Sequence, residues 1–417
     1  MKFDDYYISP EIKKNLDELG FKRPTDIQYK AIPHILKGED VLAIAQTGTG
    51  KTAAFAIPVL QLLHENKTRQ RRADGIKCLV MVPTRELAIQ ITEVFKEIGS
   101  NTKLNIFCVF GGVEQDTQIA KLQEGVDILV VTPGRMFDLV SQGHIRLNRV
   151  NTLVLDEADH MLDLGFIKDI RDLIRFLPES RQTLFFSATI NKEIKKLAYS
   201  LVNKPIRIQI SPKNPVAKSV DHSIAKVAID DKRFFLEYLI NENPDSKILV
   251  FVRTKVRAER VLKAMERVNI KTETIHGGKD QDARFDVMNN FKTGKTKILI
   301  ATDVSARGID IPNVDYVVNY DMPEQVENYV HRCGRTGRGN SRGTAVSFCS
   351  KEENDLLKEI EEFIGKTVKV TEIDKSAYQN ILEQSDNGTD NWQDLLKNAE
   401  AEEQQVKKLK KKRRKKK

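Results

Sequence analysis

Residues 153–159, with the sequence LVLDEAD, combine a short apolar run with three carboxylates. An apolar run of this kind is typical of a buried strand in a parallel sheet. Asp156, Glu157 and Asp159 follow at its end, which is where open α/β sheets bind ligands. Carboxylates this close repel one another, so the pattern predicts a divalent metal carried by a nucleotide. The alternative is a solvated acidic turn.

A second stretch, QTGTGKT at 46–52, has the residue types of a phosphate-binding loop. It lies between an apolar strand at 40–45 and an apolar helix, which is the context that a P-loop requires. Backbone N–H groups would close around phosphate oxygens, Lys51 would reach the terminal phosphates and Thr52 would bind Mg²⁺. A chance occurrence is the alternative, because Ala45 stands where the general pattern has its first glycine.

Other strand-like runs, at 78–82, 106–110, 128–131 and 183–186, end in small, polar or basic residues. The residues after these runs include Pro83, Thr84, Arg85, Gly112, Thr132, Gly134, Arg135, Ser187 and Thr189. Each of these segments alone has a composition that is common in loops between strands and helices. Together they place glycines, hydroxyls and two arginines at one edge of a sheet, and such groups contact phosphates and sugars.

A second alternating series of strands and helices follows a linker with two prolines at 211–215. Its predicted strands are 248–252, 274–276, 298–301, 316–320 and 344–348, and it contains no P-loop of its own. Two of its turns could do chemistry: ATDVSARGID at 301–310 and HRCGRTGR at 331–338. The second turn is either a solvated basic turn or a set of arginines that reach a nucleotide bound by the first domain.

The alternation of strands and helices predicts an α/β fold with two parallel-sheet domains in tandem. We expect the domains at 1–210 and 217–370, followed by a flexible tether and a basic tail at 371–417. The net charge of +9 comes from this tail, because residues 407–417 carry ten basic side chains. Such a block repels itself, so we expect it to be disordered.

The composition, 40% hydrophobic and 30% charged, is ordinary for a soluble globular protein. No run approaches the roughly 18 apolar residues of a membrane span, and residues 1–5 lack the apolar core of a signal peptide. The four cysteines show neither zinc spacing nor a disulfide framework. We therefore expect a cytoplasmic protein without membrane contact, and we take a monomer as the default.

The segment GFKRPTDIQ at 20–28 has two interpretations. Phe21 either joins the core or offers a flat apolar face to a base. Gln28 is either a structural polar residue or an amide that bonds the amino group and N7 of adenine. Composition alone favours the structural interpretation.

Taken together, these motifs resemble the DEAD-box RNA helicases, superfamily 2 ATPases with two RecA-like domains. The matching motifs are GFxxPTxIQ at 20–28, AQTGTGKT at 45–52, PTREL at 83–87, GG at 111–112, TPGR at 132–135, DEAD at 156–159, SAT at 187–189, QxxR at 281–284, ARGID at 306–310 and HRxGRTGR at 331–338. Ala45 is the family's form of the loop, and Phe3 matches its isolated upstream aromatic. Cys333 and Ser305 depart from the family's usual aliphatic residue and alanine. The short N-terminus and basic tail look most like the bacterial RhlE-type subgroup.

The resemblance implies ATP and Mg²⁺ as cofactors. The residues implied in nucleotide binding are Phe21, Gln28, Thr47, Gly48, Thr49, Gly50, Lys51, Thr52, Asp303, Arg335 and Arg338. Asp156 would act on the metal through water, and Glu157 would polarise the attacking water. Arg335 and Arg338 would reach the γ-phosphate when the domains close, and Asp303 would meet the ribose. The residues implied in coupling hydrolysis to domain geometry are Ser187, Thr189, Asp159 and His331.

The resemblance also implies RNA as the partner, as single strands and short duplexes bound with little sequence specificity. The implied RNA-binding residues are Pro83, Thr84, Arg85, Gly112, Thr132, Gly134 and Arg135 in the first domain and Arg253, Gly277, Gln281, Arg284 and Thr302 in the second. Closure would bend one strand and expel its partner, giving local and non-processive unwinding. The basic tail would add non-specific affinity, and ribonucleoprotein or ribosome-assembly partners would suit such an activity.

Two other functions compete with this one. An ATP-gated RNA clamp or ribonucleoprotein remodeller would use the same residues with little unwinding. A DNA translocase would share the two-domain ATPase architecture. The glutamine motif at 20–28 and the intact sequences at 156–159 and 331–338 argue against this function.

Overall fold

The computed structural model describes residues 2–46, 48–69, 75–210, 216, 219–306, 314–337, 342–371, 376 and 379. The predicted linker at 211–215 and the basic tail at 407–417 lie outside these residues, as do Thr47, Arg338 and the side chain of Gln281. Within the described ranges, no helix combines the length and the apolar character that crossing a membrane requires.

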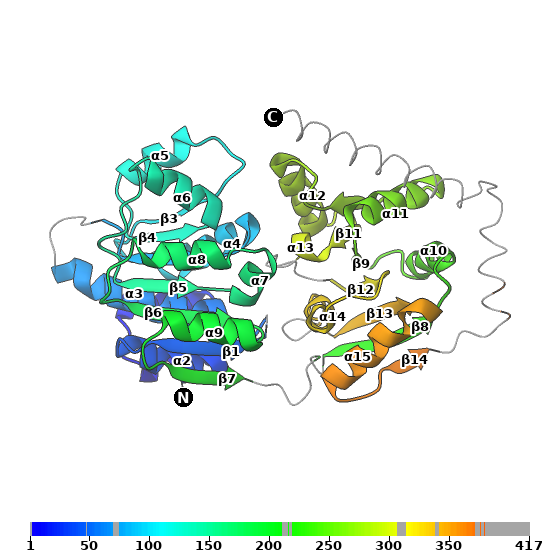
Figure 1. Cartoon of the computed structure of the whole chain (residues 1–417), viewed down its shortest axis with the longest axis horizontal. Helices are drawn as coiled ribbons and strands as arrows, with labels where there is room; N and C mark the ends of the chain where they lie inside the picture. The colour runs from blue at the N-terminus through cyan, green and yellow to red at the C-terminus, as the bar shows by residue number, and fades with distance from the viewer. Residues whose placement is uncertain are drawn as a thin grey trace.

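The first domain is built on a sheet of seven parallel strands in the order β3-β4-β2-β5-β6-β1-β7 (Figure 1). The strands are β1 (Val41–Ala45), β2 (Cys78–Met81), β3 (Ile106–Val109), β4 (Ile128–Val131), β5 (Thr152–Leu155), β6 (Gln182–Ser187) and β7 (Ile206–Ile210). Every residue of β1, β2, β4, β5 and β6 is buried, as expected for a parallel sheet with both faces covered.

Helices cover both faces of this sheet. They are η1 (Phe3–Asp5), α1 (Pro10–Glu18), α2 (Asp26–Leu36), α3 (Lys51–Arg69), α4 (Arg85–Ile98), α5 (Asp116–Gln123), α6 (Pro133–Ser141), α7 (Ala158–Asp163), α8 (Ile167–Ile174) and α9 (Lys192–Leu201). In β1, Val41 and Ala43 belong to one core cluster, whereas Leu42 and Ile44 belong to the other. Alternating side chains of the strand therefore belong to two separate hydrophobic cores, one on each face of the sheet.

The first helix, α1, ends at Glu18, and Leu19 is its C-cap. Leu16 is buried in the core, whereas Leu19 is 41% exposed.

The second domain repeats the design with seven parallel strands in the order β10-β11-β9-β12-β13-β8-β14 (Figure 1). The strands are β8 (Val220–Lys226), β9 (Ile248–Val252), β10 (Glu273–Ile275), β11 (Ile298–Thr302), β12 (Tyr316–Asn319), β13 (Gly343–Cys349) and β14 (Lys369–Thr371). The helices are α10 (Lys232–Glu242), α11 (Lys255–Arg267), α12 (Gln281–Thr293), α13 (Asp303–Ala306), α14 (Val326–Cys333), η2 (Lys351–Glu353) and α15 (Asn354–Ile364). The predicted α/β fold with two parallel sheets is confirmed.

The strand order decides which loops meet. Because the strands of each sheet are parallel, their C-terminal loops all emerge at one edge. In the first sheet β5, β6 and β1 are neighbours, so the loops at 156–159, 187–189 and 46–52 converge. Strands β3, β4 and β2 are also neighbours, so the loops at 111–112 and 132–135 converge with the one that follows β2. The edge is thereby divided into two adjacent sites.

Candidate functional site

The loop between β1 and α3 has the backbone of a phosphate-binding loop. Gly48 and Gly50 have φ angles of +80° and +89°, a left-handed conformation that favours glycine. A Cβ on Gly50 would lie 2.6 Å from Nε2 of Gln28, so no side chain fits there. The loop leads into the N-terminus of α3, where free N–H groups and the helix dipole favour an anion.

Lys51, the first residue of α3, carries a buried charge. It is 7% exposed, and its Nζ has no hydrogen-bond partner among the described residues. Its positive charge acts on Asp156 and Glu157 at the end of β5. Because an unpaired buried ammonium is costly, Lys51 is suited to bind the anionic phosphates that the loop would hold.

Asp156 is a buried carboxylate at the end of β5. It is 2% exposed, and its Oδ1 accepts a hydrogen bond of 2.9 Å from the Glu157 backbone N–H. The pKa of Asp156 is raised to about 6, because burial and the nearby Glu157 charge raise it more than the Lys51 charge lowers it. A carboxylate whose ionised form is disfavoured fits a position beside a cation.

Magnesium at this site would need ligands from the nucleotide. Among the described residues, no group of three or more His, Cys, Asp and Glu side chains could hold a metal alone. Mg²⁺ prefers octahedral oxygen coordination and keeps several waters, with one or two protein ligands besides substrate phosphates. Thr52 and Asp156 follow β1 and β5 at the same edge and fit that limited role.

Glu157 has a left-handed backbone, with φ 53° and ψ 48°, and is the N-cap of α7. Such a conformation costs a non-glycine residue about 1–3 kcal/mol and is often found at functional sites. Burial would raise the pKa of Glu157, but His160 and the charges of Lys51 and Arg335 lower it to about 2. Glu157 is therefore ionised at neutral pH, as a residue that polarises water must be.

His160 is a site residue that the sequence analysis missed. Its Nδ1 lies 3.4 Å from Oε2 of Glu157, and the side chain is 3% exposed. The available signal was its position three residues after Glu157, because residues i and i+3 share a helix face.

Arg335 of the second domain acts on the site of the first. It is 4% exposed, follows α14, and its positive charge helps to lower the pKa of Glu157. An arginine from one domain beside the carboxylate of another is the arrangement expected for an arginine finger. The second predicted finger, Arg338, lies outside the described residues.

Asp159 and Thr189 join the loops after β5 and β6. Oδ2 of Asp159 accepts hydrogen bonds from the Thr189 backbone N–H at 3.0 Å and from its Oγ1 at 3.1 Å. Ser187 ends β6 with its Oγ buried and, in the described part of the chain, without a hydrogen-bond partner. His331 is half-buried on α14. The structure thus directly connects two of the four residues predicted to couple hydrolysis to domain geometry.

Gln28 contacts the phosphate loop. It is 2% exposed, its Oε1 accepts from the Thr25 backbone N–H at 2.9 Å, and its Nε2 donates to the Gly50 carbonyl at 3.2 Å. Phe21 is half-buried, with its ring centroid 6.1 Å from that of Phe3 at an interplanar angle of 76°. Phe21 therefore packs against the N-terminal segment and still keeps part of its surface accessible.

A cluster of arginines lies at the other half of the same edge. Gly112 has φ +80°, and a side chain there would collide with the guanidinium of Arg85. Nη2 of Arg135 donates to the Val113 carbonyl at 2.9 Å. Burial lowers the pKa of Arg85, as do the charges of Arg284 and Arg135, while Glu86 opposes the shift. Three guanidinium groups that repel one another favour a bound polyanion.

The other predicted residues of this half-site lie at the ends of β2 and β4 and in the helix starts that follow. Pro83 is buried, and Gly134 is exposed. Thr84 is the N-cap of α4, with its Oγ1 accepting from the Leu87 N–H at 3.3 Å. Thr132 is the N-cap of α6 and is 8% exposed.

Arg284 of α12 forms an ion pair with Glu86 of α4, at 2.5 Å between Nη2 and Oε1. The two side chains are only 15% and 9% exposed, and they belong to different domains. Arg284, predicted to contact RNA, is here engaged between the domains. Glu86 was not selected from the sequence, although it stands in the PTREL motif.

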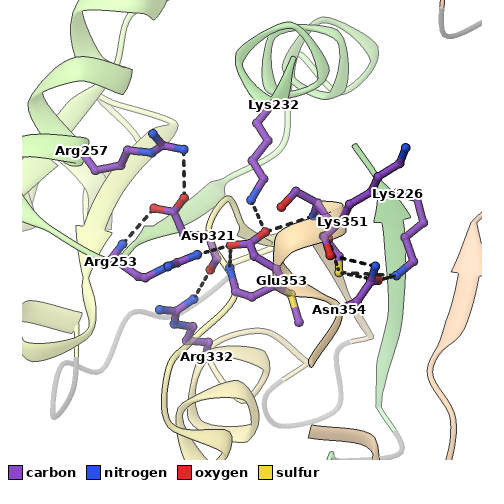
Figure 2. Close-up of polar contacts among 12 residues, drawn as sticks. Lys226, Lys232, Arg253, Arg257, Asp321, Arg332, Lys351, Glu353 and Asn354 are labelled. Atoms are coloured by element: carbon purple, nitrogen blue, oxygen red, sulfur yellow. Dashed lines mark hydrogen bonds and ion pairs between the residues drawn. The ribbon is translucent and has the colours of Figure 1, made fainter. Parts of the chain in front are cut away.

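Arg253 follows β9 and is held by two carboxylates (Figure 2). Its guanidinium donates to Glu353, and its backbone N–H donates to Oδ2 of Asp321 at 3.1 Å. Glu353 also accepts from Nζ of the fully buried Lys232 at 2.6 Å, and Arg257 pairs with Asp321 at 3.2 Å. The Arg253 side chain keeps 33% of its surface exposed, so it can still contact a ligand.

Asp303, at the start of α13, is oriented by Arg332. Nε and Nη2 of Arg332 lie 2.6 and 2.7 Å from the two carboxylate oxygens. Nη1 of Arg332 donates to the Asp321 carbonyl at 2.7 Å, which ties α14 to the ends of β11 and β12. Asp303 retains 22% of its side-chain surface for a ligand. Arg332 was not among the predicted site residues, although it is the first arginine of the basic turn.

The remaining predicted residues lie on neighbouring strand ends. Gly277 is exposed, and a Cβ there would meet nothing within 4 Å. Thr302 ends β11, is 8% exposed and lies 3.4 Å from Ser305 through the two hydroxyls. Gln281 begins α12. Because β10, β11 and β9 are neighbours, these loops and Arg253 share one edge of the second sheet.

Comparisons with known proteins agree with this arrangement. The family model "DEAD/DEAH box helicase" matches residues 25–197, and the model "Helicase conserved C-terminal domain" matches residues 231–340. ATP-dependent RNA helicase DbpA of Bacillus subtilis (strain 168) is 40% identical over 364 residues, covering 87% of this chain and 74% of DbpA. ATP-dependent RNA helicase RhlB of Shewanella frigidimarina (strain NCIMB 400) is 41% identical over 379 residues, covering 90% of this chain and 87% of RhlB.

A solved structure aligns with both domains at once. It is S. cerevisiae Dbp5 bound to RNA and ADP BeF3, with 30% identity and a TM-score of 0.82 over 92% of this chain and 98% of Dbp5. Each of the two family models falls on one of the two sheets, in the order of the motifs. Together with relatives at 40–41% identity along most of their length, these matches show that the chain belongs to the DEAD-box family of ATP-dependent RNA helicases, which are ATP-hydrolysing enzymes.

Proposed function

We propose that this protein couples the binding and hydrolysis of Mg²⁺-ATP to closure of its two domains on RNA, with local strand separation as the result. The observation that carries the proposal is the ion pair of Arg284 with Glu86, at 2.5 Å across the domain boundary. The charge of the buried Arg335 of the second domain also acts on Glu157 of the first. An ATP site completed by the second domain makes hydrolysis depend on closure. The likeness to Dbp5 bound to RNA and ADP BeF3, which extends over both domains, supports the same conclusion.

In this mechanism the first domain binds the nucleotide. Phe21 stacks on adenine, Gln28 reads its edge, and Lys51 and Thr52 hold the phosphates and the metal. Glu157, which its low pKa keeps ionised, orients the attacking water. Arg335 and Arg338 stabilise charge on the transferred phosphoryl group, and fingers of this kind give about 10³–10⁵ in rate.

RNA binds at the other half of the edge, where Arg85 lies against Gly112 and Arg135 donates to the Val113 carbonyl. The second domain adds Arg253, Gly277 and Thr302. These groups would contact phosphates and sugars, so sequence specificity is slight and single strands or short duplexes are the substrates. ATP and RNA then bind cooperatively, because both stabilise the same closed state.

The finer assignments remain predictions. The RhlE-type subgroup is one of them, because the relatives reported above carry the names DbpA and RhlB. The monomeric state, the ribonucleoprotein or ribosome-assembly partners and the RNA affinity of the tail at 407–417 are the others.

The test is ATP turnover with and without single-stranded RNA, for the unmodified protein and for Glu157→Gln. We expect strong stimulation by RNA and its loss in Glu157→Gln, since the amide cannot accept a proton from water. Glu97→Gln is the matched control, because Glu97 is an exposed carboxylate of the same domain. ATP turnover that does not increase when RNA is added would refute closure of the two domains on RNA.

Two further measurements distinguish the alternative functions, a DNA translocase and an ATP-gated RNA clamp. Equal stimulation by single-stranded DNA would favour the DNA translocase. Normal RNA-stimulated turnover without separation of a short duplex, accompanied by slow RNA release, would favour the ATP-gated clamp.

A further inference from the structure

The loop between β10 and α12 is fixed by a buried histidine. His276 directly follows β10 and is 6% exposed, whereas the next two residues, Gly277 and Gly278, are exposed. The Gly278 backbone N–H donates to Nδ1 of His276 at 3.1 Å. On its other side, the ring lies 2.7 Å from the Glu259 carboxylate of α11 through Nε2.

These two contacts determine where the proton of the imidazole lies. A backbone N–H can only donate, so Nδ1 of His276 must be the acceptor in its bond with Gly278. The ring proton is therefore on Nε2 and is donated to Oε1 of Glu259. The same oxygen accepts from Oγ1 of Thr274 at 3.0 Å. Burial would raise the pKa of Glu259, but these two hydrogen bonds and the Lys279 charge lower it, so its carboxylate is a lasting acceptor.

The glycine loop faces protein on one side and open space on the other. A Cβ on Gly278 would lie 3.2 Å from Nδ1 of His276 and 3.6 Å from Cδ of Lys255, so α11 and the ring fill that side. A Cβ on Gly277 would meet nothing within 4 Å. The backbone of Gly277 is thereby presented at the same edge as Thr302, where a phosphate can approach it closely.

We propose that His276 is a positioning residue for RNA binding, which holds the Gly277–Gly278 backbone in place through the acceptor at its Nδ1. Glu259 enforces the tautomer that makes this acceptor available. His276 itself does not touch RNA. This inference rests on the proposed function, because it assumes that the exposed loop binds an RNA phosphate.

The experiment compares three substitutions of His276 by RNA-stimulated ATP turnover. Asn places its Oδ1 where Nδ1 was and keeps the acceptor, whereas Gln reaches only the Nε2 position and Ala replaces neither nitrogen. We expect His276→Ala and His276→Gln to raise the half-saturating RNA concentration about fivefold, as the loss of one hydrogen bond would. His276→Asn should stay within about twofold of the unmodified protein. Turnover at saturating RNA should change little in all three, because the contact positions RNA and does not take part in the chemistry.

Thermal unfolding is the control, because it checks that all three variants fold.

The outcomes distinguish this inference from the proposed function. Equal behaviour of the Asn and Ala variants, or rescue by Gln alone, would each overturn the role of Nδ1. If the unmodified protein is not stimulated by RNA at all, the proposed function fails, whatever the variants do.

Discussion

At the scale of residues, Asp156 and Glu157 are neighbours whose pKa values move in opposite directions. Burial dominates at Asp156 and raises its pKa to about 6. At Glu157, the hydrogen bond from His160 and three nearby positive charges outweigh burial and lower the pKa to about 2. In the proposed function, Asp156 therefore acts on a cation and Glu157 on water, although both residues follow the same strand.

The raised pKa of Asp156 predicts that this residue destabilises the protein when no metal is bound. An acid whose folded-state pKa is raised costs stability above that pKa, and the cost disappears as the pH falls below its ordinary value of 3.8. At about 1.4 kcal/mol per pKa unit, the shift corresponds to about 3 kcal/mol at pH 7. Asp156→Asn should therefore unfold at higher denaturant concentration than the unmodified protein, without nucleotide or magnesium, while it loses ATP hydrolysis.

Urea unfolding at pH 7 and pH 3.5 measures this effect. The stabilisation should be present at pH 7 and absent at pH 3.5, where both states hold the proton. Asp138→Asn is the matched control, because Asp138 is an exposed carboxylate of the same domain. A loss of stability in Asp156→Asn at pH 7 would contradict the argument.

Much of the residue-scale site could be predicted, because motifs place residues along the chain at strand ends. Lys51, Asp156, Glu157 and Arg335 do lie where their charges act on one another. His160 had a local signal in its spacing from Glu157, whereas Glu86, Arg332 and His276 could not be predicted in the same way. Their roles depend on partners in other elements, and contacts of that kind leave no local pattern in the sequence.

At the scale of elements, the ends of β9, β12 and β13 are joined by Glu353 of η2 (Figure 2). Its carboxylate accepts from Lys232 and Arg253 and from the backbone N–H groups of Met322 and Ser350, at 3.2 and 3.1 Å for the latter two. Burial lowers the pKa of Lys232, but the attraction of Glu353 opposes this shift and keeps the pair ionised. The network fixes the strand ends that carry Arg253 and lead to α14.

The buried pair predicts a strong dependence of one partner on the other. Glu353→Leu leaves the fully buried ammonium of Lys232 without its carboxylate and should destabilise the second domain by about 3–5 kcal/mol. The double variant Lys232→Met with Glu353→Leu should recover much of this loss, because no isolated buried charge remains. Urea unfolding of the single and double variants provides the coupling energy.

The exposed pair of Lys358 and Asp355 on α15, at 3.2 Å, is the control for this cycle. Both side chains are mostly exposed, so the same cycle there should give under about 1 kcal/mol. Simple additivity of the two changes at Lys232 and Glu353 would rule out the pairing as the source of the effect.

The elements themselves were predictable to different degrees. Strands β1, β2, β4, β5 and β6 are buried along their whole length and appear as apolar runs. Strands β7, β8 and β14 were not predicted, because β7 and β14 lie at sheet edges and β8 mixes polar with apolar residues. An edge or partly exposed strand need not be apolar, so periodicity alone does not reveal it.

At the scale of the whole molecule, charged side chains link the two domains within the described residues. The charge of Arg335 acts on Glu157, and Arg284 pairs with Glu86 beside the arginine cluster. In the proposed function, the first contact would make hydrolysis depend on closure, and the second would link closure to the site proposed for RNA. Each ligand should then increase the affinity for the other.

The ion pair between Glu86 and Arg284 allows this coupling to be tested without altering the residues that bind ATP. Glu86→Gln and Arg284→Gln should each weaken the enhancement of ATP-analogue affinity by RNA about tenfold, because both remove a partly buried charge pair that lies between the domains. If the proposed closure on RNA forms this pair, analogue affinity without RNA should not change. The double variant should be no worse than either single variant, because the partners act as a unit. Analogue binding measured with and without single-stranded RNA gives all the values needed. Additive losses in the double variant would mean that each side chain contacts RNA independently, and closure would then have to be attributed to Arg335 and the bound ligands alone.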